Sequence, residues 1–290
     1  MKSHAICSVF TLMMVTALLS SCEKMVPSEG TGVKNADKAN VVLRVSRFEQ
    51  TPLENLTRTP VGNVCTRLSF AIYDETGTRT ELLSQKEGDA DFGVASLSLE
   101  EGDYQLVVVG HSGMNNPSFK ANEKVSITGK NMTDTFWGSE TLKVGAEQVN
   151  MNLSLKRIVS LVRILPDDDF PEEADSIQIS YKGSRGSFDG LTGYGSTTAK
   201  QTVGLSLKGD SRQIEFYLIP RDEEDMIDMT VETFSAATRL TQKIIENVPL
   251  QRNSATICRG ILFDNESNTR NSSVMVSVDD TWEESIQVKF

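Results

Sequence analysis

Apolar and polar residues alternate with a period of two along most of this chain, and this alternation constrains the fold more than any other feature. One example is the set Val41, Leu43 and Val45, which are apolar and lie at every second position. The residues between them would lie on the opposite face of a strand. Similar alternation recurs in residues 68–73, 95–99, 149–156 and 227–231. A period of two is typical of strands with one face on a core and the other in solvent. The sequence therefore predicts an all-β protein.

The strands are short and are separated by turn residues, and the series begins again near Ile158. No segment keeps a helical period for more than about ten residues. Short strands at this spacing are typical of β-sandwiches. We expect two tandem sandwiches, residues 40–157 and 158–290, each of ordinary domain size. One fused sandwich is the alternative, and the halves are too dissimilar to establish a sequence repeat.

The N-terminus has the organisation of a bacterial lipoprotein signal. A weakly basic start, Met1–His4, precedes an apolar run, Ala5–Leu19, and the residues Leu19-Ser20-Ser21-Cys22 resemble a lipobox. In such a site the cysteine sulfur receives a diacylglycerol and the preceding peptide is removed. We expect residues 1–21 to be a signal peptide, Cys22 to be lipidated and residues 22–39 to be a flexible tether. The alternative is a buried N-terminal segment with a chance cysteine.

No later stretch approaches about 18 consecutive apolar residues, so a transmembrane helix is not expected and the acyl chains would be the membrane anchor. The net charge is −11, and loss of Lys2 with the signal gives −11 − 1 = −12. An acidic chain is a poor partner for nucleic-acid phosphates and for an anionic membrane surface. We interpret the charge as a source of solubility in preference to an acidic binding face.

Two of the four cysteines remain once the lipoprotein signal is accounted for. Cys7 lies in the signal and Cys22 would carry the lipid, which leaves Cys65 and Cys258. Export permits a disulfide between these two, and it would bridge the two halves of the chain. Two buried free thiols are the alternative.

The sequence offers little for catalysis. His111 is the one histidine of the mature chain, and its neighbour Ser112 is not placed as a triad nucleophile, so we expect a loop histidine without a role. Zinc spacing and a phosphate-binding glycine loop are both missing. We expect no cofactor. The acidic clusters 167–169 and 222–225 are interpreted as solvated turns, with a calcium site or a glycosidase pair as alternatives.

Five stretches taken together resemble a known family. They are Cys65–Asp74, Gly102–Gly110, Asp134–Gly138, Leu155–Val159 and Arg252–Thr256. With the lipobox, their order resembles that of FimB-type fimbrial anchor and assembly lipoproteins of type V pili, found in Gram-negative anaerobes. The resemblance covers nearly the whole mature chain.

This resemblance implies two transthyretin-like β-sandwiches, a cell-surface location on the outer membrane and no enzymatic activity. It implies fimbrial subunits as partners, joined when an extended segment of one subunit completes a sheet of another. Stalk subunits of such pili lose an N-terminal segment to an arginine-specific protease. Here Arg44, Arg47 and Arg58 are the candidate cut sites; an uncut chain suits an anchor, and a cut chain suits a stalk or tip subunit.

Two further readings remain open at this point. One is a surface glycan-binding lipoprotein, with Trp137 and Tyr194 as a sugar-stacking platform, although core aromatics are the commoner explanation. The other concerns Asp175-Ser176-Ile177, which resembles an O-glycosylation acceptor triplet of exported proteins in these bacteria.

Overall fold

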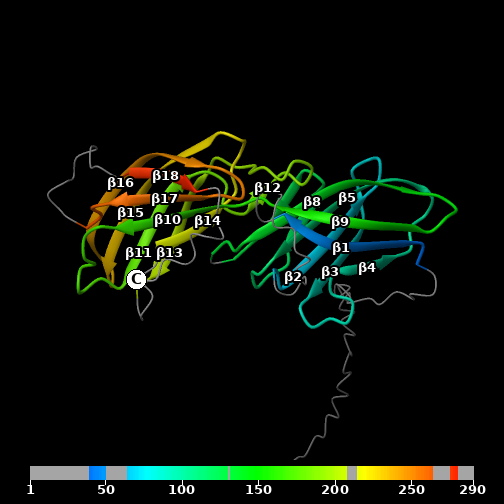
Figure 1. The fold of residues 1–290 in the computed structure, drawn as a ribbon, viewed down its shortest axis with the longest axis horizontal. Coiled ribbons are helices and arrows are strands. Elements are labelled where there is room, and N and C mark those ends of the chain that lie inside the picture. Colours follow the sequence, from blue (N-terminus) through cyan, green and yellow to red (C-terminus); the bar gives the residue numbers. More distant parts are fainter. Residues whose placement is uncertain (1–38, 50–63, 130, 208–213, 264–274, 280–290) are drawn as a thin grey trace, which may run out of the picture. The chain divides into compact units, whose positions relative to one another are not determined.

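The computed structural model describes residues 39–49, 64–129, 131–207, 214–263 and 275–279, and all of them belong to one compact unit, Val33–Phe290. Every named secondary-structure element in these ranges is a β-strand, as Figure 1 shows. The predicted all-β class is therefore confirmed. Across the same ranges we find no helix with the length and apolar character that a membrane span requires.

The largest sheet has seven strands in the order β3-β2-β5-β8-β9-β1-β4. Its strands are β1 (Val41–Glu49), β2 (Arg67–Tyr73), β3 (Arg79–Lys86), β4 (Val94–Leu97), β5 (Gly102–His111), β8 (Thr135–Val144) and β9 (Val149–Arg157). Only two residue pairs, Phe136↔Arg157 and Trp137↔Lys156, join β8 to β9. The sheet thus consists of two nearly separate layers, β3-β2-β5-β8 and β9-β1-β4.

Two four-stranded sheets follow, in the orders β14-β10-β17-β18 and β13-β11-β15-β16. The first contains β10 (Ser160–Pro166), β14 (Ile214–Leu218), β17 (Ala255–Gly260) and β18 (Met275–Asp279). The second contains β11 (Ser176–Lys182), β13 (Lys200–Ser206), β15 (Asp225–Ser235) and β16 (Thr238–Leu250).

The two halves repeat one strand order. In the first half β1 lies between β4, to which it is antiparallel, and β9, to which it is parallel. In the second half β10 lies in the same way between antiparallel β14 and parallel β17. The facing layers, β3-β2-β5-β8 and β13-β11-β15-β16, also correspond strand by strand. The repeat is one of topology, which the sequence of the halves does not reveal.

Buried side chains form one cluster in each half and a third cluster that draws on both. Ala71 of β2 and Val107 of β5 pack in this third cluster with Leu161 and Phe188. As a result β2 is buried on both faces beyond its first residue, which corrects the expectation of a single core face. The other face of β2, with Leu68 and others, lies in the first-half core.

A small sheet also joins the halves. Its strands are β6 (Ser118–Ala121), β7 (Lys124–Ser126) and β12 (Ser187–Phe188), in the order β12-β7-β6. Phe188 pairs with Val125 and is fully buried. Residues 183–199, which connect β11 to β13, therefore contain a short strand that is part of the contact between the halves.

Candidate functional site

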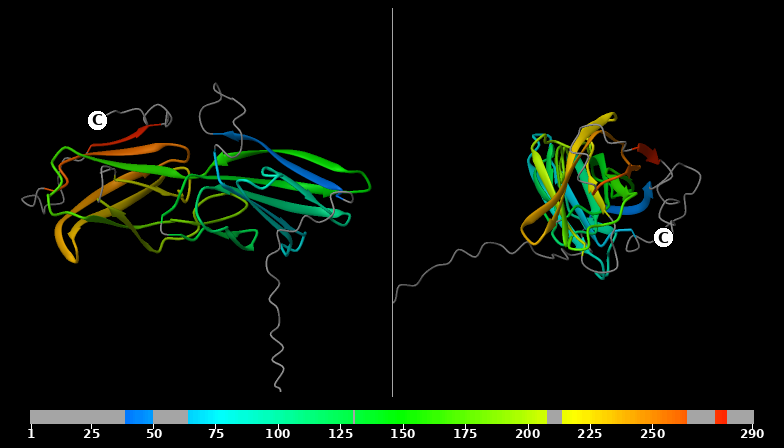
Figure 2. Two further views of the ribbon diagram at one scale, coloured as in Figure 1. Left: turned by 90° about the horizontal axis from the view of Figure 1, so that it is seen from below. Right: turned by 90° about the vertical axis from the view of Figure 1, so that its left-hand side faces the viewer.

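Strand β1 is held on both sides within its layer. Val41 to Arg44 pair with β4 in the antiparallel sense, and Val41 to Glu49 pair with β9 in the parallel sense. The register shifts by one residue between Val45 and Arg47, which marks a β-bulge. Figure 1 and Figure 2 show β1, in blue, alongside β9. A single segment near the N-terminus thus separates two other strands.

The two faces of β1 differ in the way the alternation predicts. Val41 and Leu43 are fully buried and Val45 is nearly so, and all three pack in the first-half core. Arg44 lies on the exposed face. Burying each apolar side chain stabilises the fold by about 1.5–3 kcal/mol. The strand is therefore an integral part of the core although it precedes the rest of the sandwich in sequence.

Asn40 fixes the start of β1, and sequence reasoning missed it. Its side-chain amide donates to the carbonyl of Leu99 at 2.8 Å, and its side-chain oxygen accepts from the N–H of Leu99 at 2.9 Å. Its backbone N–H donates to Leu97 at 3.1 Å, and its carbonyl accepts from Val149 at 2.8 Å. These four bonds attach the end of β1 to both neighbouring strands. A lone asparagine before a strand carries no sequence signal for such a role.

The candidate cut sites fall in different places. Arg44 is exposed in the middle of β1, opposite Val94 and Asn152. Arg47 lies at the bulge, and its Nε is buried without a hydrogen-bond partner in the described part of the chain. Arg58 and the lipidation residue Cys22 lie outside the described residues. Because Arg44 and Arg47 belong to a paired strand, a protease would reach their bonds only after β1 leaves the sheet.

If β1 leaves, the layer is left with a vacant position between β9 and β4. The inward edges of both strands would then expose unpaired N–H and C=O groups, above the cavity left by three apolar side chains. Such a vacancy can be filled by another extended segment with apolar residues at alternate positions. The arrangement is suited to strand exchange.

Three of the five family-like stretches meet at the contact between the halves. Arg157 binds Asp134 through two bonds, Nε to Oδ1 at 2.8 Å and a terminal nitrogen to Oδ2 at 2.7 Å. Its other terminal nitrogen donates to Asn253 at 2.9 Å, and its guanidinium carbon lies 5.1 Å from the ring centre of Phe136. Arg157 is only 6% exposed. The stretches thus form a joint, a role that their separate positions in sequence do not indicate.

The aromatic residues proposed as a sugar platform belong to the same contact region. Trp137 donates from its indole nitrogen to the carbonyl of Gly190 at 2.7 Å and packs against the shared core. Tyr194 lies under Arg252, whose guanidinium carbon is 3.2 Å from the ring centre. Both rings are therefore engaged within the protein, as the core-aromatic alternative expects.

The two remaining cysteines are free. Cys65 is buried in the first-half core and Cys258 in the second-half core, so separate clusters hold the two sulfurs. Burial raises the pKa of each thiol to about 12. The alternative of two buried free thiols describes the structure, and the disulfide is not formed.

His111 is the last residue of β5 and is fully buried, which corrects the expectation of a loop histidine. Its Nδ1 accepts from the N–H of Gly113 at 2.9 Å, and its Nε2 has no partner among the described residues. Burial, and to a smaller extent the charge of Arg67, lower the pKa of His111 to about 4. A neutral imidazole enclosed in this way is a structural group.

Each of the two acidic clusters contains a carboxylate that is bound to other groups of the protein. Asp168 accepts the N–H groups of Leu262 at 2.8 Å and Phe263 at 2.6 Å. Asp225 is buried and forms an ion pair with Arg221. Within the described ranges no group of three or more potential ligand side chains is placed to hold a metal ion. These carboxylates organise turns.

Ser176 of the acceptor-like triplet is partly buried at the start of β11. Its hydroxyl donates to Asp175 at 2.7 Å, and Asp175 also accepts the N–H of Ala236 at 2.8 Å. The triplet is therefore part of a hydrogen-bonded corner, and its glycosylation stays a prediction.

Comparison with known proteins identifies one family and several solved structures to which this chain is similar. Residues 114–289 match the model of a family described as "Family of unknown function (DUF6562)". No curated protein matches the chain. A solved candidate adhesin from Bacteroides thetaiotaomicron is 12% identical with a TM-score of 0.50, over 83% of this chain and 95% of its own.

Two other solved structures have similar coverage. A candidate polysaccharide-binding protein from Bacteroides thetaiotaomicron is 8% identical with a TM-score of 0.51, over 76% of this chain and 90% of its own. The fimbrial anchor protein Mfa2 from Porphyromonas gingivalis is 12% identical with a TM-score of 0.42, over 82% of this chain and 96% of its own. At these identities the two Bacteroides thetaiotaomicron structures establish a shared fold and nothing finer.

Proposed function

This chain belongs to the DUF6562 family of unknown function, and we propose that it is a non-enzymatic cell-surface fimbrial subunit that joins its fibre by β-strand addition. The observation that carries the proposal is the place of β1, a terminal segment that lies between two strands of its layer. The descriptions of the two similar Bacteroides thetaiotaomicron structures, as an adhesin and a polysaccharide-binding protein, favour a surface role for this chain over an enzymatic one.

The finer proposal is a FimB-type anchor and assembly protein, held in the outer membrane by lipid on Cys22. Residues 22–39 lead directly into β1, so the lipid and the exchangeable strand are on one segment. An uncut chain can release β1 to a partner's strand and still remain attached to the membrane. A cut after Arg58 would remove the lipid and the whole of β1 together, whereas a cut after Arg44 or Arg47 would divide the strand.

Locking β1 to β4 tests strand addition directly. Val42 and Ser96 lie opposite each other on the outward face, within the Cα separation that a disulfide can bridge. We expect Val42→Cys/Ser96→Cys to lose capture of fimbrial subunits when oxidised and to regain it on reduction. The variant leaves all three candidate arginines in place.

A matched lock provides the control. Gln105→Cys/Thr141→Cys joins two strands, β5 and β8, that strand addition does not separate. This variant should capture fimbrial subunits equally well in both redox states. Undiminished capture by the oxidised β1 lock would contradict strand addition at this position.

The choice between anchor and processed subunit depends on the N-terminus of the native protein. Intact mass spectrometry should find an acylated Cys22 on a full-length chain if the protein is a retained anchor. A free N-terminus after Arg44, Arg47 or Arg58 would identify the alternative, a processed stalk or tip subunit.

A further inference from the structure

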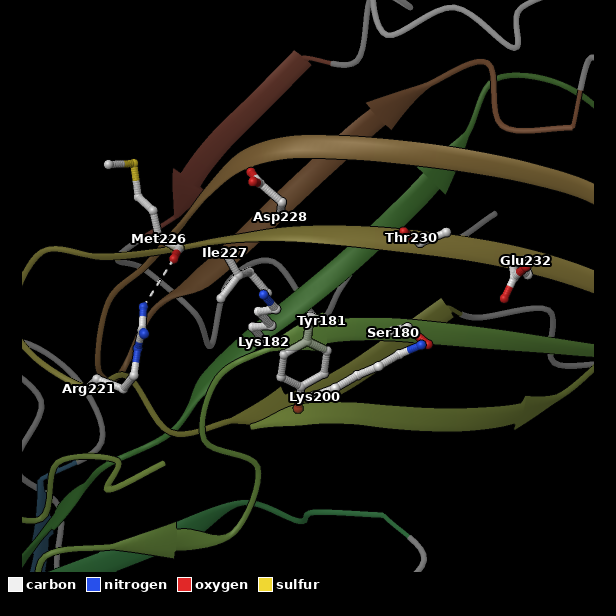
Figure 3. A pocket seen from close by; sticks show the side chains of 10 residues that line it. All are labelled: Ser180, Tyr181, Lys182, Lys200, Arg221, Met226, Ile227, Asp228, Thr230 and Glu232. Atoms are coloured by element: carbon white, nitrogen blue, oxygen red, sulfur yellow. Dashed lines mark hydrogen bonds between the residues drawn. The ribbon is translucent and has the colours of Figure 1, made fainter. Parts of the chain in front are cut away.

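The solvent face of the sheet β13-β11-β15-β16 is hollowed along its strands. One hollow of about 570 Å³ extends over β11, β13 and β15, and Figure 3 shows its lining, which includes Ser180, Lys182, Lys200 and Thr230. A second hollow of about 400 Å³ lies over the same strands and includes Gln178, Gly204 and Phe234. The polar lining residues alternate along the strands with residues of the second-half core, and Tyr181 and Ile227 of that core also border the first hollow.

The strand register arranges polar groups on this face in rows. Ser180 is paired with Thr202 on one side and with Thr230 on the other, which forms a row of three hydroxyls. Gln178 is paired in the next row with Gly204 and Glu232. Hydroxyl, amide and carboxylate groups thus follow one another across three adjacent strands.

Two residues along the strands from Ser180 and Thr202, the pair Lys182 and Lys200 lies at one end of these rows. They lie directly opposite each other across antiparallel strands, and both are exposed. Like charges in directly opposed positions destabilise a sheet. Neither amine forms an ion pair within the described residues. Figure 3 shows the Lys200 side chain extending in the direction of Ser180 and the Lys182 side chain extending in a different direction, toward Ile227.

Across the described strands, the two carboxylates on this face form no ion pair with either lysine. Glu232 pairs with Arg239 at 2.8 Å, and Asp228 accepts the N–H of Asn247 at 2.8 Å. In a chain of net charge −11, two lysines at opposed positions without an ion pair in the described ranges give this part of the surface a local positive charge. An anionic ligand group would compensate their charge.

Gly204 supplies an independent indication of a ligand. It lies in the interior of β13, its φ is not in the left-handed region, and a Cβ there would meet nothing within 4 Å. Neither backbone conformation nor packing therefore calls for glycine. A glycine in a strand interior weakens the strand and often marks a place that a ligand approaches closely.

We propose that this face, from the Lys182–Lys200 pair along the hydroxyl row to Gly204, binds an acidic oligosaccharide. The lysines would hold a carboxylate, and the hydroxyl and amide groups would bind sugar hydroxyls. Partly buried Phe234 provides apolar surface at the far end. The site is independent of β1, so its failure would leave the proposed strand addition untouched.

A peptide is a poorer occupant of this face. The backbone groups of β11 and β15 are paired on both sides, so an extended peptide could not add to these strands. Over β11 and β15 only side chains are available, and the outward ones in the middle of the face, which are Gln178, Ser180, Thr230 and Glu232, are polar. Their spacing along the strands suits a chain of sugar rings, which presents hydroxyl groups on every unit.

Isothermal titration of the full mature chain tests the proposal. The probe is a galacturonic acid oligomer, and the matched control is its methyl ester, which has the same backbone without charge. We expect saturable binding of the acid, at least about tenfold weaker binding of the ester, and a loss of about tenfold or more in Lys182→Gln/Lys200→Gln. Lys120→Gln/Lys143→Gln, an equal loss of charge on the first half, should bind like the wild type.

Gly204→Val separates a binding role from a structural one. The added side chain has free space and suits a strand, so the Tm should stay the same or rise while binding is lost. Binding retained in Gly204→Val or in the lysine variant would overturn the assigned location. No saturable binding of galacturonate, alginate or hyaluronan oligomers, or equal binding of a poly-glutamate peptide, would overturn an acidic-glycan site.

Discussion

At the scale of single residues, Arg157 links Asp134 of its own half to Asn253 of the other half. It is almost fully buried, and it binds Asp134 twice and Asn253 once. Arg157→Met would leave Asp134 without its counter-charge in a site where that side chain is 25% exposed. Breaking a buried pair in this way typically costs about 3 kcal/mol or more. Urea unfolding should show this loss in the free energy of unfolding.

A second ion pair is the control for Arg157. Arg259 and Asp167 are each about half exposed, with their nearest charged atoms 3.3 Å apart. Arg259→Met should therefore cost less than about 1 kcal/mol. An equal effect of the two substitutions would mean that the joint adds nothing beyond a surface ion pair.

His111 predicts an acid-sensitive component of stability. Its pKa is lowered from 6.5 to about 4 in the fold, so between these values the unfolded chain binds more protons than the folded one. Its contribution is complete above about pH 6.5 and is lost as the pH falls towards 4, by at most about 3 kcal/mol. His111→Asn keeps an acceptor for Gly113 and does not titrate. Chemical unfolding at pH 7 and pH 4.5 should show a smaller acid loss in this variant, and an equal loss would contradict the assignment.

At the scale of elements, β1 should be separable from the sandwich that it completes. A chain lacking residues 1–49 would lose the burial of Val41, Leu43 and Val45, at about 1.5–3 kcal/mol each. We expect a lower Tm that is restored by a peptide of residues 40–49 and not by the same peptide with Leu43→Asp. Calorimetry with and without peptide measures this. If the truncated chain were as stable as the intact one, β1 would not contribute to the stability of the sandwich, and the expectation would be wrong.

The sequence predicts β1 well but not its partners. Alternation at Val41, Leu43 and Val45 correctly identifies the strand and its core face. It carries no information on pairing, so the parallel contact with residues 149–156, more than a hundred positions away, is beyond it. Likewise β16 escapes prediction because its long run includes buried Lys243 and Thr241, which blur the alternation. The candidate site is defined by the pairing of β1 with β4 and β9. Because the alternation does not reveal pairing, the sequence identifies β1 and not the site.

At the scale of the whole molecule, the shared core should couple the two halves. Side chains of β2 and β5 pack with Phe188 and others of the second half, and β12 pairs with β7. Contacts of this kind make local unfolding of one half costly for the other. We expect a single calorimetric transition for the mature chain, with equal calorimetric and van't Hoff enthalpies. Two resolved transitions would contradict this coupling.

The parallel placement of β1 beside β9, repeated in β10 beside β17, has a mechanical consequence. Traction on the start of β1 and on the end of β9 pulls two neighbouring strands in opposite directions along their own axes. The hydrogen bonds between them are then loaded together in shear, instead of one after another as in peeling. Single-molecule extension between the tether and the C-terminal half should therefore meet high resistance, whereas extension between β2 and β3 should yield at lower force, because that antiparallel hairpin opens bond by bond. Under the proposed strand addition, the strand that bears this load is also the strand that is exchanged with a partner.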